Sequence, residues 1–102
     1  MNNFYLYILK CNDASYYIGH TDCLEQRIEE HKAGQGGSYT SKRLPLELVF
    51  SQEFATRDEA FNMERQIKKW TRKKKEALII NNWEKLILLS KKKYSYFNGL
   101  IS

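Results

Sequence analysis

A carboxylate falls where the sequence predicts an apolar helix face. At about 100° per residue, Glu64 lies within the face that Ala60 and Ile67 define in a helix predicted to begin near Thr56. An ionised carboxylate there costs on the order of several kcal/mol unless it is paired with a cation. Its partner is either Arg27, in a structural salt bridge, or a hard divalent ion such as Mg²⁺ or Mn²⁺, which carboxylate oxygen suits as a ligand.

Arg27 and His31 flank the apolar stripe of another predicted helix, whose buried side is marked by Leu24 and Ile28. A guanidinium held at such an edge suits recognition of a phosphate or of a developing anion. The alternative is an arginine whose stem covers the core while its head forms a surface ion pair.

Tyrosines gather at the start of the chain. Of seven in all, four lie in the opening segment, and alternation places Tyr5 and Tyr7 on one face of a strand. A phenol with a pKa near 10 is a poor base, but a nearby cation or metal-bound water lowers the barrier to proton transfer through it. Packing in the core is the alternative for each tyrosine, including Tyr16 and Tyr17.

One small domain has to position these residues. The 102 residues, 42% hydrophobic and 28% charged, allow one modest core and predict a folded chain. No apolar run approaches the roughly 20 residues that span a bilayer, and no apolar signal region follows Met1, so we expect a cytoplasmic protein without a membrane partner. Cys11 and Cys23 lack metal-site spacing and are expected to be reduced.

Turn and capping signals divide the chain into strands and helices. Phe4–Leu9 and Tyr16–Gly19 predict a β-hairpin, and 46–54 predicts a third strand after a flexible loop over 34–38. Capping boxes at Asp22 and Thr56 predict helices that end at Gly34 and at about Arg72. A short helix over 75–81 and a last helix over 83–89, packed back on the domain, complete the prediction.

The predicted order is therefore β-β-α-β-α-α plus a C-terminal helix. Without strict βαβ alternation, this order favours the α+β class, with a small three-stranded antiparallel sheet flanked by helices. We expect one domain over residues 1–102, with its core at about 4–80 and a C-terminal helix and basic tail over 82–102.

Positive charge is concentrated in the last part of the chain. Residues 1–64 carry 6 Lys and Arg against 10 Asp and Glu, a net charge of −4, whereas residues 65–102 carry 11 against 2, a net charge of +9. Basic residues with interleaved Trp70, Tyr94 and Tyr96 are typical of a polyanion-binding surface. A solvated helix face followed by a basic tail is the alternative.

Taken together, these residues resemble a known family. Tyr5-Leu6-Tyr7, then Tyr17-Ile18-Gly19, then Arg27, His31 and Glu64 resemble the motifs of the GIY-YIG nuclease superfamily over residues 4–80. The similarity is greatest to its small single-domain bacterial members, related to the N-terminal nuclease domain of the excinuclease C subunit. The resemblance implies that the two motif tyrosines lie on adjacent strands of a three-stranded antiparallel sheet.

The resemblance also implies roles. Glu64 would be the sole protein ligand of Mg²⁺ or Mn²⁺, Arg27 would hold the scissile phosphate, Tyr17 would help to deprotonate the attacking water, and Tyr7 and His31 would orient or assist. Together these groups supply what phosphodiester hydrolysis needs. We expect the five side chains to converge on one concave surface of the sheet.

The function expected from this resemblance is a metal-dependent DNA endonuclease that acts in repair or processing. With no separate recognition module, it should prefer a branch, a nick or a single-stranded junction, or rely on a protein partner for targeting. Basic residues of the stretch 65–75 and of the loop 38–43 should contact phosphates without sequence choice, and Gly19 should let the backbone approach the nucleic acid. The expected contact residues are Gly19, Lys42, Arg43, Lys68, Lys69, Arg72, Lys73, Lys74 and Lys75.

Two positions depart from the family pattern. The first motif retains only its final tyrosine, Tyr7, and Glu76 stands where many members have an asparagine about three helical turns after the glutamate. The rival interpretation is a nucleic-acid-binding module of the same fold without turnover, and RNA as the substrate is a further variant. An interaction domain that binds no nucleic acid would leave the basic part of the chain unexplained.

Overall fold

The structure is a computed structural model that describes residues 3–91, with side-chain surroundings as far as residue 81. The chain divides into two compact units, Met1–Lys69 and Trp70–Ser102. That residues 1–102 form one domain stays a prediction, as does the packing of the C-terminal helix on it, and the tail beyond residue 91 lies outside the described residues. Within residues 3–91, no helix is long and apolar enough to cross a membrane.

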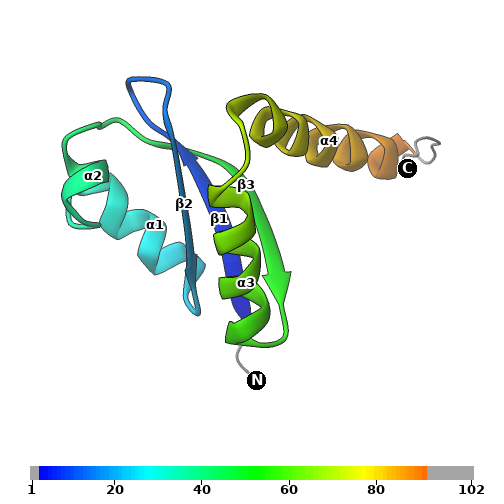
Figure 1. The fold of residues 1–102 in the computed structure, drawn as a ribbon, viewed down its shortest axis with the longest axis horizontal. Coiled ribbons are helices and arrows are strands. Elements are labelled where there is room, and N and C mark those ends of the chain that lie inside the picture. The colour runs from blue at the N-terminus through cyan, green and yellow to red at the C-terminus, as the bar shows by residue number, and fades with distance from the viewer. Residues whose placement is uncertain (1–2, 92–102) are drawn as a thin grey trace. The chain divides into compact units, whose positions relative to one another are not determined.

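The first unit is built on a three-stranded antiparallel sheet. Its strands are β1 (Phe4–Lys10), β2 (Tyr16–Thr21) and β3 (Glu47–Phe54), in the order β2-β1-β3 (Figure 1). Aromatic and β-branched residues favour these strands, and Asp13 closes the β1–β2 turn by accepting hydrogen bonds from the amide and hydroxyl of Ser15. The sheet with flanking helices confirms the predicted α+β class.

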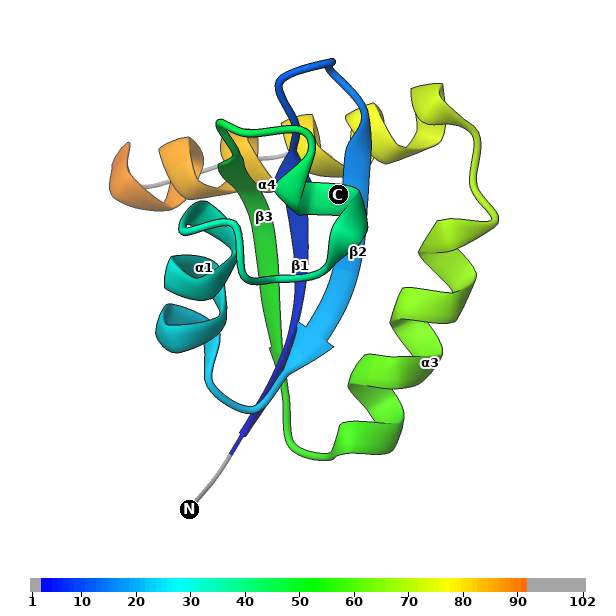
Figure 2. The ribbon, with the colours of Figure 1, turned by 90° about the vertical axis from the view of Figure 1, so that its left-hand side faces the viewer.

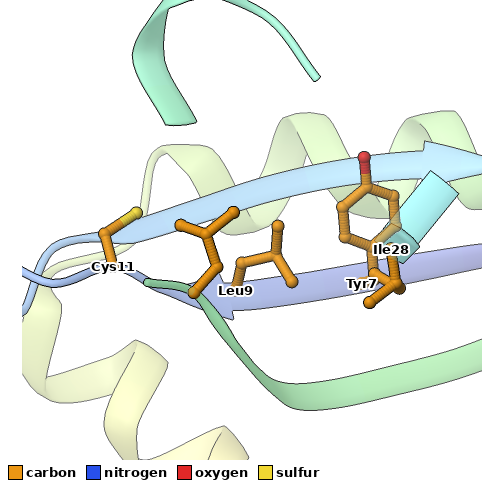
Figure 3. Close-up of a cluster of buried hydrophobic side chains, with 5 residues drawn as sticks. Tyr7, Leu9, Cys11 and Ile28 are labelled. Atoms are coloured by element: carbon orange, nitrogen blue, oxygen red, sulfur yellow. The ribbon is translucent and has the colours of Figure 1, made fainter. Parts of the chain in front are cut away.

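Strand alternation separates two packing faces. On one face, the fully buried Leu6 and Ile8 pair with β2 residues that lie under helix α3 (Arg57–Lys68). On the other face, Tyr7 and Leu9 form a cluster with Cys11, Leu46 and Ile28 of helix α1 (Leu24–Lys32) (Figure 3). Helices α1 and α3 lie on either side of the strands (Figure 2).

Helix α1 starts and ends through different signals. The predicted start at Asp22 is wrong, because the N-cap is Cys23 and no side chain caps this end. The carboxylate of Asp22 lies 3.8 Å from the guanidinium of Arg57 instead. The predicted end is confirmed, since Gly34 follows the last turn with a φ of 82°, a left-handed conformation that glycine adopts without strain.

The loop that follows α1 holds one unpredicted helical turn, α2 (Ser38–Ser41).

The second predicted helix ends earlier than expected. It stops at Lys68 rather than near Arg72, because Thr71 begins a new helix by accepting a hydrogen bond from the amide of Lys74 at 3.2 Å. This new helix is α4 (Arg72–Lys91), and it replaces the two separate helices predicted over 75–81 and 83–89.

The capping box at the start of α3 gives a prediction about stability. Thr56 accepts a hydrogen bond from the amide of Glu59 at 3.2 Å, and the Glu59 carboxylate accepts one from the amide of Thr56 at 3.3 Å. Replacing Thr56 by Ala should lower the free energy of unfolding by about 1 kcal/mol, measured by urea denaturation followed by circular dichroism. Thr56→Ser keeps the oxygen and should lose much less; equal losses in both variants would show that the cap is not the cause.

Candidate active site

Three rings gather on the α1 side of the sheet. The ring of Tyr17 lies 6.3 Å from that of Tyr7 and 5.2 Å from that of His31, and the Tyr7 and His31 rings are 5.7 Å apart, centroid to centroid. Tyr7 and Tyr17 come from the adjacent strands β1 and β2, as the resemblance implied, while His31 comes from the last turn of α1. The predicted grouping of these three residues is therefore present in the structure.

A chain of hydrogen bonds runs through the buried part of this group. The hydroxyl of Tyr7 lies 2.9 Å from Nε2 of His31, and Nδ1 of the same ring lies 2.9 Å from the hydroxyl of Thr40 in α2. All three side chains are buried, with exposed fractions of 1–2%. The imidazole thus joins a strand tyrosine to a threonine that the sequence did not single out.

Two glycines make room for these rings. A Cβ atom built on Gly19 would lie 2.6 Å from the Tyr7 hydroxyl, and one built on Gly36 would overlap Nδ1 of His31. Gly19 is the cross-strand partner of Tyr7, so the phenol leans over the backbone of the edge strand. This packing gives Gly19 a structural role, and its contact with nucleic acid stays a prediction.

Burial and neighbouring charges shift the titration of Tyr7 and His31. Burial and then Tyr17 raise the pKa of Tyr7, with a further increase from the negative charge of Glu64, while Arg27 opposes the shift. Burial and then the positive charge of Arg27 lower the pKa of His31, against the effect of Glu30. The phenol is therefore protonated and the imidazole neutral at neutral pH.

Arg27 lies beside this group on the exposed side of α1. Its guanidinium donates to the carboxylate of Glu30 at 3.2 Å, an ion pair between two side chains that both reach solvent. The alternative that Arg27 is the structural partner of Glu64 is wrong, because other residues occupy both oxygens of that carboxylate.

Glu64 is buried, as its helix angle predicted, with 8% of its surface exposed. Its Oε1 lies 2.5 Å from Nδ1 of His20, and its Oε2 lies 2.6 Å from the ammonium of Lys68, one turn further along α3. The Lys68 side chain itself is half-exposed. His20 was missed in the sequence, although its position directly after Gly19 places it on the face that α3 covers.

The expectation that all five side chains share one face of the sheet is wrong. His20 pairs with Leu6 and Gly19 with Tyr7, so consecutive β2 residues point to opposite faces. Glu64, held by His20, lies on the α3 face, whereas Tyr7 lies on the α1 face. Only the edge strand β2 separates Glu64 on one face from Tyr7 on the other. The negative charge of Glu64 therefore still raises the pKa of the Tyr7 hydroxyl.

Glu64 suits a hard divalent ion. Its surroundings are built around a negative charge, with one cation and one imidazole on its oxygens. Among the described residues, no three of the His, Cys, Asp and Glu side chains are grouped as a metal site. A single carboxylate would leave the remaining positions to water and phosphate oxygens, as is usual for Mg²⁺.

Several of the residues expected to contact nucleic acid make contacts within the chain. Arg43 donates to Asp13 at 3.0 Å and to the carbonyl of Tyr39 at 2.8 Å, and its guanidinium lies 3.7 Å from the centre of the Tyr39 ring. Lys68 pairs with Glu64, and Arg72 pairs with Glu76 at 3.0 Å.

The other expected basic contacts are less engaged. The ammonium of Lys74 lies 4.4 Å from the centre of the Trp70 ring, within the second unit. Of the other four side chains, Lys42, Lys69 and Lys73 are exposed, and Lys75 is half-buried.

Sequence inspection also missed the residues of α2. Tyr39 stacks on Tyr17, with ring centroids 6.0 Å apart and planes inclined by 29°, and its hydroxyl donates to Ser15 at 2.7 Å. The run Gly34-Gln35-Gly36-Gly37 predicted only a flexible loop. An aromatic residue and a threonine directly after that loop were the one available signal that it is ordered.

Comparison with known proteins gives matches over most of this chain. Residues 3–77 match the GIY-YIG catalytic domain. The UPF0213 protein YazA of Bacillus subtilis (strain 168) is 46% identical over 78 residues, covering 76% of this chain and 79% of that protein. The UPF0213 protein HQ_3675A of Haloquadratum walsbyi is 46% identical over 79 residues, covering 76% of this chain and 89% of its own length.

Two solution NMR structures are also similar. The UPF0213 protein BH0048 of Bacillus halodurans has 42% identity and a TM-score of 0.51, covering 76% of this chain and 82% of its own. The protein EF2693 of E. faecalis has 34% identity and a TM-score of 0.52, covering 94% and 95%. With a domain match over most of its length and relatives of this similarity, the chain belongs to the GIY-YIG family.

Proposed function

We propose that this protein is a divalent-metal-dependent endonuclease that hydrolyses DNA phosphodiester bonds, with a preference for branched, nicked or partly single-stranded DNA in repair or processing. The observation that carries the proposal is the buried carboxylate of Glu64, which only the edge strand β2 separates from the buried, hydrogen-bonded pair of Tyr7 and His31. A nuclease needs a negative ligand for a metal beside groups that orient water and phosphate, and this edge offers both.

Glu64 would hold Mg²⁺ or Mn²⁺. A divalent ion bound there would stabilise negative charge on the phosphate and on the leaving oxygen. For Oε2 to become a ligand, the Lys68 ammonium has to give up its 2.6 Å contact, which its half-exposed position allows. His20, which contacts Oε1, would keep the carboxylate oriented.

Arg27 would hold the scissile phosphate. Its present partner, Glu30, is a neighbour on an exposed helix surface, and such pairs contribute only about 0–1 kcal/mol. A phosphate, which accepts two parallel hydrogen bonds from a guanidinium, is the stronger partner.

The two motif tyrosines would have different roles, one as a hydrogen-bond donor and one in deprotonating the attacking water. Because its pKa is raised, Tyr7 stays protonated and suits hydrogen-bond donation to an oxygen in the site. Tyr17 is only half-buried, and its ring contacts both Tyr7 and Tyr39. It is the phenol to which an attacking water has access, so it would assist in taking the proton of that water.

The role of Glu64 can be separated from its contribution to stability. Glu64→Gln should abolish Mg²⁺-dependent cleavage of labelled branched DNA, but should cost only about 1 kcal/mol in the free energy of unfolding, because the amide can still accept from Lys68 and no buried cation is stranded. Gel assays with Mg²⁺, Mn²⁺ or EDTA, together with urea denaturation, measure both effects.

Glu29→Gln, which removes a charge from the exposed surface of α1, is the matched control and should leave both cleavage and stability near wild type. Full cleavage by Glu64→Gln, or cleavage that is unaffected by EDTA, would reject the metal-dependent nuclease. DNA binding without any cleavage by the wild type would favour the binding-module interpretation.

The basic start of α4 should govern binding rather than chemistry. Replacing Lys73 and Lys74 by Ala should weaken DNA binding at all sequences and reduce the salt dependence by roughly one unit of slope per lost phosphate contact. Fluorescence anisotropy between low and physiological salt measures both quantities. The pair Lys10→Ala and Lys32→Ala removes the same charge from the first unit; an identical effect of the two pairs would show that only net charge matters.

A further inference from the structure

The hydrogen-bond chain through His31 has a direction. Thr40, His31 and Tyr7 are joined by two hydrogen bonds of 2.9 Å, and a neutral imidazole carries one proton on its two ring nitrogens. Either Thr40 donates to Nδ1 and Nε2–H donates to Tyr7, or Tyr7 donates to Nε2 and Nδ1–H donates to Thr40. In each case one hydroxyl proton at the end of the chain needs an acceptor outside it.

The Thr40 end offers no acceptor. Its side chain is 1% exposed, and within the described part of the chain the Thr40 hydroxyl has no hydrogen bond besides that to His31. If Nδ1–H donated to this hydroxyl, the threonine proton would be buried without a partner, at a cost of about 1–3 kcal/mol.

The Tyr7 end faces the candidate site. The charged and ionisable groups that act on the Tyr7 hydroxyl are Tyr17, Arg27 and Glu64, which are the residues expected to handle water, phosphate and metal. Tyr7 is itself only 2% exposed, but its ring lies 6.3 Å from that of the half-buried Tyr17. The acceptor for its proton therefore has to be an oxygen bound in the site. A free hydroxyl proton is therefore better placed at Tyr7 than at Thr40.

We propose that Thr40 is a positioning residue whose hydroxyl donates to Nδ1 of His31, which fixes the imidazole as the Nε2–H tautomer and leaves the Tyr7 hydroxyl free to donate to an oxygen in the site. His31 then donates to the Tyr7 oxygen rather than taking its proton. The consequence for catalysis rests on the proposed nuclease function, whereas the tautomer does not.

The surroundings of α2 are built to hold Thr40 in place. The carbonyl of Thr40 accepts from the amide of Arg43 at 3.0 Å, and the Arg43 carbonyl accepts from the amide of Asn12 at 2.9 Å, which ties α2 to the β1–β2 turn. Gly36, in the loop before α2, allows that loop to lie against the same ring. A threonine fixed in this way can select one tautomer, as outer hydrogen-bond partners of histidines commonly do.

The tautomer can be measured directly on the full chain. In ¹⁵N-labelled wild type above pH 7, long-range ¹H–¹⁵N correlation of His31 should show the proton on Nε2 and a hydrogen-bonded, unprotonated Nδ1. A proton on Nδ1 would overturn the proposal without the use of any variant.

Variants of Thr40 test its part in fixing the tautomer. Thr40→Val keeps the shape and removes the hydroxyl, so the Nδ1 resonance should move to the position of an unbonded nitrogen, and cleavage should fall about tenfold or more. Thr40→Ser restores the donor and should recover both the resonance and the activity. An Nδ1 resonance unchanged in Thr40→Val would overturn the proposal, and the Thr40→Ser and wild-type spectra decide the matter if the valine variant does not fold.

Failure of this inference differs from failure of the nuclease proposal. A wild type that cleaves DNA but carries its His31 proton on Nδ1 rejects the role of Thr40 alone. A wild type with the proton on Nε2 that cleaves no nucleic acid rejects the nuclease proposal and leaves the assignment of the tautomer standing.

Discussion

The buried hydroxyl of Tyr7 has to be hydrogen-bonded, and much of the first unit is arranged to meet that requirement. A phenol in the core without a partner would cost on the order of 1–3 kcal/mol. His31 supplies the partner from α1, and Thr40 completes the chain from α2. The short helix and the loop before it, which have few apolar residues of their own, are thereby tied to the centre of the sheet.

Glu64 imposes a second constraint on the opposite face. A buried carboxylate requires a cation or several donors, and the free protein provides Lys68 and His20. The lysine offsets the negative charge of the carboxylate, and the imidazole holds its other oxygen. Gly19 is the cross-strand partner of Tyr7, and its missing side chain leaves room for the Tyr7 phenol over the edge strand.

The basic residues fall into two kinds. Arg43 is bound between Asp13, the Tyr39 carbonyl and the Tyr39 ring, so it orders the loop rather than offering an unengaged charge. Lys69 and Lys73, by contrast, are exposed. Segregated charge in a sequence therefore indicates a class of partner, but the intramolecular contacts decide which members of the cluster are available to that partner.

Much of the fold and part of the site follow from the sequence alone, because their causes are local. The hairpin, the third strand, the capping box of α3 and the end of α1 at Gly34 depend on neighbouring residues. The burial of Glu64 followed from helix periodicity in the same way. The ordered motifs Tyr5-Leu6-Tyr7 and Tyr17-Ile18-Gly19, with Arg27, His31 and Glu64, were enough to indicate the family that the domain comparison confirms.

Only the tertiary structure determined which side chains contact each other. Periodicity places Glu64 and Arg27 on their own helices but carries no information about which face of the sheet each helix covers. The pairing of Glu64 with His20 and Lys68 could therefore not be predicted from the sequence. The same holds for the edge strand that separates Glu64 from Tyr7. Thr40 reaches His31 because a glycine-rich loop brings a single helical turn against the ring. Such contacts join residues that are distant in the chain, and their energies depend on burial and on the absence of competing partners, which no local pattern records.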